Sequence, residues 1–422
     1  MPSVPLPASG GYIQAVRESS EAVRIKANIK INEEDMTRLL LSPAFTSTYQ
    51  RLRTAHGMTL PLNFSSVAQE LNVLSVLSVL NFASGYRVPL HVATGRGAFD
   101  NIRAFVFAAH ISSSSGEDDY FSARGMQAIT PPAVADLMRV TGSIHVERPH
   151  EDIPGVTVGE LGGPIWEIVQ IVARTLNETG AALAQGGYPD LGSFVLEALK
   201  EGEKAKASGG DACDVALERL VRCIPAFRDA APVYDAPVYC FKKALLTLHA
   251  VALRFGPAGK TPTRAVPAPD TTRLPIFSDN VIPSLLVHLG VLDLSAADPA
   301  LGLPALFPHA RDPAVLAPLL AASPAPAPAE VLAQMPAKAK EPPKEGPRVT
   351  QAQAFALRGA AIDVCERLVA HGRTLAAGAD PELAWLGELM PPELDAWLWA
   401  VAKDRPDYRR LERFALTGTA YF

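Results

Sequence analysis

Apolar residues recur at helical spacing along most of the 422-residue chain, and this period limits the possible folds more than any other feature. Between Val67 and Phe82, leucines stand at positions 71, 74, 77 and 80. Such spacing places them on one face of an α-helix. Only the stretches 143–146, 156–158 and 237–240 have the character of short strands. The sequence therefore predicts a mainly α fold.

Residues that favour helix N-termini mark several of these segments. Asn32 precedes three acidic residues, which suit the positive end of the helix dipole. Thr130 precedes Pro131 and Pro132, and proline is tolerated in a first helical turn because its missing N–H has no partner there. We expect further helices at 100–110, 160–177, 191–201, 284–289 and 351–371.

The charge and the cysteines exclude several classes of protein. A net charge of −5 argues against stable binding of long nucleic acids, which needs a basic face, although two or three cations suffice to bind one small phosphate. The four cysteines lack the spacing of a zinc site or a disulfide framework, and we expect them to be reduced. They are Cys213, Cys223, Cys240 and Cys365.

The chain carries no signal for a membrane or for export. Its first eleven residues are rich in Pro, Ser and Gly and lack the basic and apolar parts of a signal peptide. No window reaches about 18 uninterrupted apolar residues, the length of a transmembrane helix. We therefore expect a cytoplasmic protein that does not contact a membrane.

Two regions differ in composition from the rest of the chain. Residues 1–30 are expected to form a flexible N-terminal segment, and residues 298–348 are rich in Pro and Ala, which predicts a largely disordered stretch. That stretch reads either as a linker between two domains or as an insertion into one. The short helical pattern after it favours an insertion, so one domain is expected over residues 31–422.

No common catalytic signature is present, but charged residues interrupt three apolar runs. They are Arg228-Asp229, Lys242-Lys243 and Asp279. Burying a charge without a function is costly, so each is a candidate site residue. The alternatives are structural: Asp279 caps the following helix or pairs with Lys242, and the lysines lie on a solvated helix edge.

These stretches resemble the queuosine salvage proteins, the queuosine 5′-phosphate N-glycosylase/hydrolase family. The similarity runs in family order from about residue 80 to the last residue. It is carried by Leu80-Asn81-Phe82, Leu176-Asn177-Glu178-Thr179-Gly180, Phe227-Arg228-Asp229, Phe241-Lys242-Lys243-Ala244, Phe277-Ser278-Asp279 with His288-Leu289-Gly290, Leu357-Arg358-Gly359, and Leu394-Asp395 to Tyr421-Phe422.

The resemblance implies a single helical domain similar to the helix-hairpin-helix DNA glycosylases, with residues 298–348 as an insertion. It implies hydrolysis of queuosine 5′-monophosphate to release the base queuine for tRNA modification. Asp279 would be the catalytic carboxylate, Lys242 would lie in the active site, and Asp395 would hold the base or the ribose. No cofactor or metal is expected, and the nucleotide is the expected partner.

Other matched residues are candidates for substrate binding. For the phosphate these are Lys242, Lys243, Arg228 and Arg358. For stacking on the base they are Phe82 and Phe277, unless these rings simply pack in the core. Arg228 reads equally well as the structural partner of Asp229. His288, on an apolar helix, is expected to be a core histidine.

The chain also departs from the family pattern, which keeps two alternative functions open. Asn280-Val281 follows Asp279 where some relatives have Tyr-Arg, and Ala356 stands where an acid is common. The first alternative is a base glycosylase of related fold that acts on nucleic acid. The second is a catalytically inactive helical protein that binds nucleotides. The sequence assigns no oligomeric state.

Overall fold

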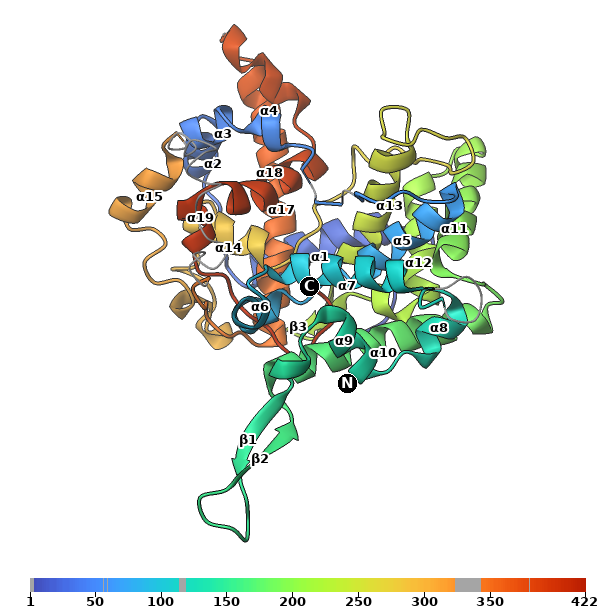
Figure 1. Cartoon of the computed structure of the whole chain (residues 1–422). Coiled ribbons are helices and arrows are strands. Elements are labelled where there is room, and N and C mark those ends of the chain that lie inside the picture. The colour runs from blue at the N-terminus through green and yellow to red at the C-terminus, as the bar shows by residue number, and fades with distance from the viewer. Residues whose placement is uncertain (1–3, 56, 59, 114–118, 323–342, 379) are drawn as a thin grey trace, which may run out of the picture.

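The computed structural model describes residues 4–55, 57–58, 60–113, 119–322, 343–378 and 380–422. Within them the chain is mainly helical, as the sequence predicts. The strands form two antiparallel hairpins: β1 (His145–Pro149) with β2 (Thr157–Leu161), and β3 (Ala230–Val233) with β4 (Ala236–Tyr239). The first hairpin projects from the body of the molecule (Figure 1).

The helices gather in two groups that lie on opposite sides of the view in Figure 1. One group contains α2 (Glu33–Leu40), α3 (Pro43–Thr46), α4 (Tyr49–Leu52), α14 (Val281–His288), α15 (Pro313–Leu320), α18 (Pro391–Asp404) and α19 (Pro406–Arg410). The other contains α5 (Val67–Val79), α8 (Ala123–Ala128), α10 (Gly163–Gln185), α11 (Leu191–Ala207), α12 (Ala212–Cys223) and α13 (Lys242–Phe255). Near the middle lie α1 (Tyr12–Lys26), α6 (Arg87–Thr94), α7 (Ala98–Ser112), α9 (Pro131–Met138) and α17 (Gln351–Ala376).

Short 3₁₀ helices connect several of these elements: η1 (Ser84–Tyr86), η2 (Thr141–Ser143), η3 (Pro225–Phe227), η4 (Pro299–Leu301), η5 (Leu303–Ala305) and η6 (Pro381–Glu388). One cluster of buried apolar side chains runs from Tyr12 to Phe422. No single helix in the described part of the chain is long and apolar enough to cross a membrane, and only Val67–Val79 with Ser84–Thr94, across a bend of 63°, meets that test jointly.

The prediction that residues 1–30 form a flexible segment is wrong, because α1 packs against α17. Tyr12 and Val16 are fully buried, and the backbone N–H of Ile13 donates to Asp214 2.7 Å away. The apolar residues of α1 recur at helical spacing and are buried, so this segment is ordered although the residues before it are rich in Pro and Gly. On the other side of the contact, α17 begins with a capping box in which Thr350 and Gln353 bind each other's backbone.

The prediction of a largely disordered stretch over 298–348 is wrong for its described parts. Residues 298–322 form η4, η5 and α15, and Arg405 donates to the carbonyl oxygens of Pro318 (3.1 Å) and Ala321 (2.7 Å). These bonds and the buried Leu319 anchor the segment in spite of its prolines. Near the other end, Val349 donates to Ala415. Residues 323–342 lie outside the described residues.

The other expected elements lie close to their predicted positions, with two corrections. The helix expected over 160–177 begins at Gly163, because Glu160 and Leu161 belong to β2. Asn32 precedes α2 but does not cap it through its side chain, which donates to Asp35. The side chain of Thr130 accepts from Ala133 and caps α9 as expected.

The close packing of α1 against α17 can be tested at Gly359. A Cβ on Gly359 would lie 2.6 Å from Cγ1 of Val23, too close for an undisturbed packing. Gly359→Ala is therefore expected to lower the free energy of unfolding by about 1–3 kcal/mol in urea titrations, and adding Val23→Ala should recover part of the loss. Gly142→Ala is the control, because a Cβ there meets nothing within 4 Å. Equal effects of both glycine substitutions would contradict the packing.

Candidate active site

A fully buried ion pair between Arg358 and Asp229 connects the segments that carry the predicted site residues. Both side chains are 0% exposed, and the guanidinium binds both carboxylate oxygens, at 2.8 and 2.5 Å. Nε of Arg358 donates to the carbonyl of Ser278 at 2.9 Å, and the Ser278 hydroxyl donates to the carbonyl of Arg358 at 3.1 Å. The pair thereby fixes the loop before α14 against α17.

Asp229 also sets the start of α13. Its Oδ2 accepts the backbone N–H of Lys242 at 3.1 Å, and its carbonyl oxygen accepts from Cys240 and Phe241. Phe241 adopts a left-handed conformation with φ of 44°, which turns the chain from β4 into the helix. A charge-assisted bond to a helix N-terminus stabilises it. The position of Lys242 therefore depends on the same ion pair.

Asp279 uses one of its two carboxylate oxygens to cap α14. Oδ1 accepts the backbone N–H groups of Val281 (2.6 Å) and Ile282 (3.2 Å), so the expected cap is present. Oδ2 accepts no hydrogen bond from the described residues. The residue is 6% exposed. A carboxylate held rigidly by one oxygen and free at the other is suited to act on a bound molecule.

Lys242 lies near Asp279 without forming a direct ion pair with it in the described part of the chain. Its Nζ donates to the carbonyl oxygen (2.7 Å) and to Oδ1 (2.8 Å) of Asn81. Burial lowers the pKa of Lys242 to about 8, and the charge of Asp279 opposes that shift. The alternative of a structural Asp279–Lys242 ion pair is not borne out, and the two groups interact over a longer distance.

Asp395 brings a second carboxyl group to the same region from α18. Its Oδ1 accepts the backbone N–H of Phe277 at 2.8 Å, two residues before Asp279. Burial raises the pKa of Asp395 to about 8, and the negative charge of Asp279 acts in the same direction. At neutral pH Asp395 is therefore mostly protonated, so it can donate a hydrogen bond.

Sequence reasoning missed two residues on the same stripe of α18. Trp399 and Lys403 follow Asp395 at intervals of four, the spacing of neighbours on one helix face. Nζ of Lys403 lies 3.3 Å from the centroid of the Trp399 ring. Burial lowers the pKa of Lys403 to about 7, which the charges of Asp100 and Asp279 oppose. This spacing was the signal that would have found them.

Two of the predicted phosphate ligands have structural roles instead. Arg358 is completely buried, and all its hydrogen bonds are to Asp229 and Ser278. Arg228 is exposed and donates to the carbonyl oxygens of Val221 and Arg222 at the end of α12. The structure thus gives both arginines structural contacts, and substrate binding by either of them stays a prediction. Arg228 does not pair with Asp229, which binds Arg358.

Lys243 and the two predicted stacking residues are deeply buried. Nζ of Lys243 donates to the carbonyl of Ala420 at 2.7 Å and lies 5.1 Å from the centroid of Phe82, so it holds the C-terminal segment. Phe82 and Phe277 are each 3% exposed. The ring of Phe277 lies 5.3 Å from that of His249. For these rings the alternative of core packing stays open.

His288 is a core histidine, as the sequence predicts. Its Nε2 donates to the carbonyl of Glu412 at 2.9 Å, and its ring lies edge-on to Phe307. Within the described residues, no group of three or more His, Cys, Asp or Glu side chains is arranged to hold a metal ion.

Comparison with known proteins adds no assignment to this geometry. No family model matches the chain, and no curated protein matches it. The relation to queuosine salvage proteins therefore stays a prediction that rests on the motifs of this chain.

The buried ion pair predicts different effects for the two arginines named by the sequence. Arg358→Met leaves Asp229 charged without its partner inside the protein and is expected to cost about 3–5 kcal/mol of unfolding free energy. Arg228→Met removes the same charge from an exposed position and should cost less than about 1 kcal/mol. Urea unfolding of both variants measures this, and similar losses would contradict the structural role of Arg358.

Asp395 predicts a dependence of stability on pH. Since its pKa rises from 3.8 to about 8 on folding, the folded chain holds the proton more tightly, and stability falls as pH rises through this window. Asp395→Asn keeps an oxygen for the Phe277 N–H but does not titrate. Between pH 5 and 7 its unfolding free energy should rise relative to wild type by about 1 kcal/mol per pH unit. A difference that does not change with pH would refute the shift.

Proposed function

We propose that this chain is an N-glycosidic hydrolase that releases queuine from queuosine 5′-monophosphate. We further propose that its helical domain is of the helix-hairpin-helix glycosylase type. The observation that carries the proposal is the free Oδ2 of Asp279, whose charge acts on a second buried carboxyl group, Asp395, and on the buried Lys242. Two carboxyl groups held in different environments at one site are typical of general acid–base chemistry.

The proposed reaction begins at the ribosyl carbon C1′. When the C1′–N bond breaks, positive charge develops on C1′ and the ring oxygen, and a nearby carboxylate stabilises it. Oδ2 of Asp279 has this role, or it accepts a proton from the attacking water. The water oxygen then bonds to C1′ and loses a proton to Oδ2 or to solvent, while the departing nitrogen takes up a proton, which gives ribose 5-phosphate and the neutral base.

The leaving base needs help from a group other than N7. Queuine is a 7-deazaguanine, so carbon replaces the nitrogen that purine glycosylases protonate. Asp395 is mostly protonated at neutral pH and can donate a hydrogen bond to the pyrimidine edge of the base as negative charge develops there. Trp399 is half-buried on the same stripe and offers a ring for stacking.

The net charge of −5 favours a free nucleotide over a base within nucleic acid as the substrate. Asn280, which replaces the tyrosine of some relatives, donates to the carbonyl of Phe414 at 2.7 Å. Asn280 therefore has a structural role next to Asp279, although it differs from the residue of some relatives. The inactive nucleotide-binding protein is the remaining alternative, and turnover separates the two.

The test is incubation with queuosine 5′-monophosphate followed by chromatography for free queuine. Wild type is expected to release the base, and Asp279→Asn should lower kcat by about 100- to 1,000-fold, the usual effect of removing one electrostatic contact to a transition state. Binding without release by the wild type would support the inactive alternative.

A matched control separates catalysis from helix capping. Asp190 caps α11 by accepting the N–H of Ser193 at 2.7 Å, away from the candidate site. Because asparagine also caps helices well, Asp190→Asn and Asp279→Asn should both keep the helix cap and stay folded, and only the second should lose activity. If Asp279→Asn stays fully active, Asp279 is a helix cap and no more.

A further inference from the structure

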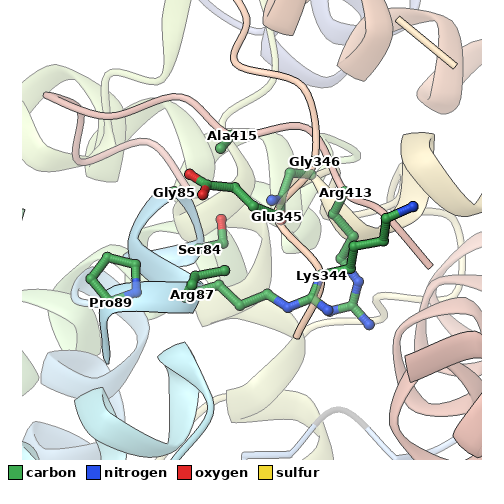
Figure 2. Close-up of a pocket in the computed structure, with 11 residues that line it drawn as sticks. Ser84, Gly85, Arg87, Pro89, Lys344, Glu345, Gly346, Arg413 and Ala415 are labelled. Atoms are coloured by element: carbon green, nitrogen blue, oxygen red, sulfur yellow. The ribbon is translucent and has the colours of Figure 1, made fainter. Parts of the chain in front are cut away.

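A small pocket lies next to Asn280, the residue that follows the candidate catalytic carboxylate in the chain. Its wall contains Asn280, the residue after Asp279, together with Ser84, Arg87, Lys344 and Arg413 (Figure 2). Arg413 precedes Phe414, whose carbonyl binds Asn280. The pocket wall therefore includes the N-cap residue of α14, which follows Asp279 in the chain.

Three residues of the pocket wall each have a buried polar atom that finds no hydrogen-bond partner among the described residues. The atoms are Oγ of Ser84, Oδ1 of Asn280 and Nε of Arg413. Buried polar atoms in folded proteins nearly always have a partner, so three orphans around one cavity point to an occupant. That occupant must accept hydrogen bonds from Arg413 and Ser84 and present a hydroxyl group to Asn280.

The charge of the wall points to an anion. Figure 2 shows the guanidinium groups of Arg87 and Arg413 close together. Burial and the charge of Arg413 lower the pKa of Arg87 to about 9, and burial lowers the pKa of Arg413 to about 10, which the charge of Asp279 opposes. Both arginines are half-buried, and two like charges held close together repel each other unless a negative group lies between them.

Among the described residues, no carboxylate forms a direct ion pair with Arg87 or Arg413. Lys344 is paired with Glu412 at 2.5 Å, and Glu345 lies near Arg348. One Nη of Arg87 donates to the carbonyl of Arg409 at 3.0 Å, and one Nη of Arg413 donates to that of Ala402 at 3.0 Å. These carbonyl contacts orient both guanidinium groups without neutralising them, which suits a site built for a phosphate.

We propose that this pocket binds the 5′-phosphate of the nucleotide on which Asp279 acts, an inference that rests on the proposed function. The phosphate oxygens accept from Arg87, from Nε of Arg413 and from Oγ of Ser84. A hydroxyl of the sugar, or of a singly protonated phosphate, donates to Oδ1 of Asn280. In this proposal Arg87 and Arg413, rather than Arg228 and Arg358, bind the phosphate. The site thereby selects a nucleotide over a nucleoside.

Ribose 5-phosphate is the probe, because it carries the sugar phosphate without the base and binds independently of any turnover. We expect calorimetry to show binding of ribose 5-phosphate, but not of ribose, to the full chain. Arg87→Met should weaken this binding by about 10- to 100-fold and Ser84→Ala by about fivefold. Arg96→Met is the matched control, since Arg96 is exposed in the turn after α6, and it should bind like wild type.

Kinetics give the second measurement. kcat/KM for queuosine 5′-monophosphate should exceed that for the nucleoside by at least tenfold, and Arg87→Met should remove most of this preference. The pocket is only a water site if ribose 5-phosphate fails to bind, or binds wild type, Arg87→Met and Ser84→Ala alike. Arg87-dependent binding without hydrolysis of either substrate would sink the proposed function and leave the phosphate site standing.

Discussion

The ion pair between Arg358 and Asp229 positions the two segments that carry Asp279 and Lys242. Arg358 holds the loop before α14 through Ser278, and Asp229 holds the start of α13 through Lys242. The rings of Phe355 and Phe422 lie 4.9 and 4.8 Å from the guanidinium carbon, so the last residue of the chain packs on the same group. Taking both charges out of water is costly, and the pair persists because each charge satisfies several segments at once.

The carboxylate of Asp279 affects the protonation of several neighbouring groups. Asp279 favours the charged forms of Lys242, Lys403 and Arg413 and the neutral form of Asp395. Burial acts against the charge on each of these groups. A core designed for stability alone would contain apolar side chains here, so the arrangement indicates a function that needs buried charge.

The helices could be predicted because period and capping residues are local, and Asp279, Lys242 and Asp395 stood out as charges within apolar runs or family motifs. The residues with which these side chains interact could not be predicted from the sequence. Asp395 binds the backbone of Phe277 across 118 residues, and nothing in the sequence says that Arg358 rather than Arg228 is the buried arginine. The first eleven residues are rich in proline and glycine and predict flexibility, whereas α1, which follows them, is held by its packing on α17, far away in the sequence.

The most direct measurement is a crystal structure of Asp279→Asn with queuosine 5′-monophosphate bound, since this variant keeps the cap of α14 but should not turn over its ligand. The account predicts C1′ in contact with the side chain of residue 279, the base beside Asp395, and the phosphate between Arg87 and Arg413. A nucleotide bound elsewhere, with C1′ remote from residue 279, would contradict it.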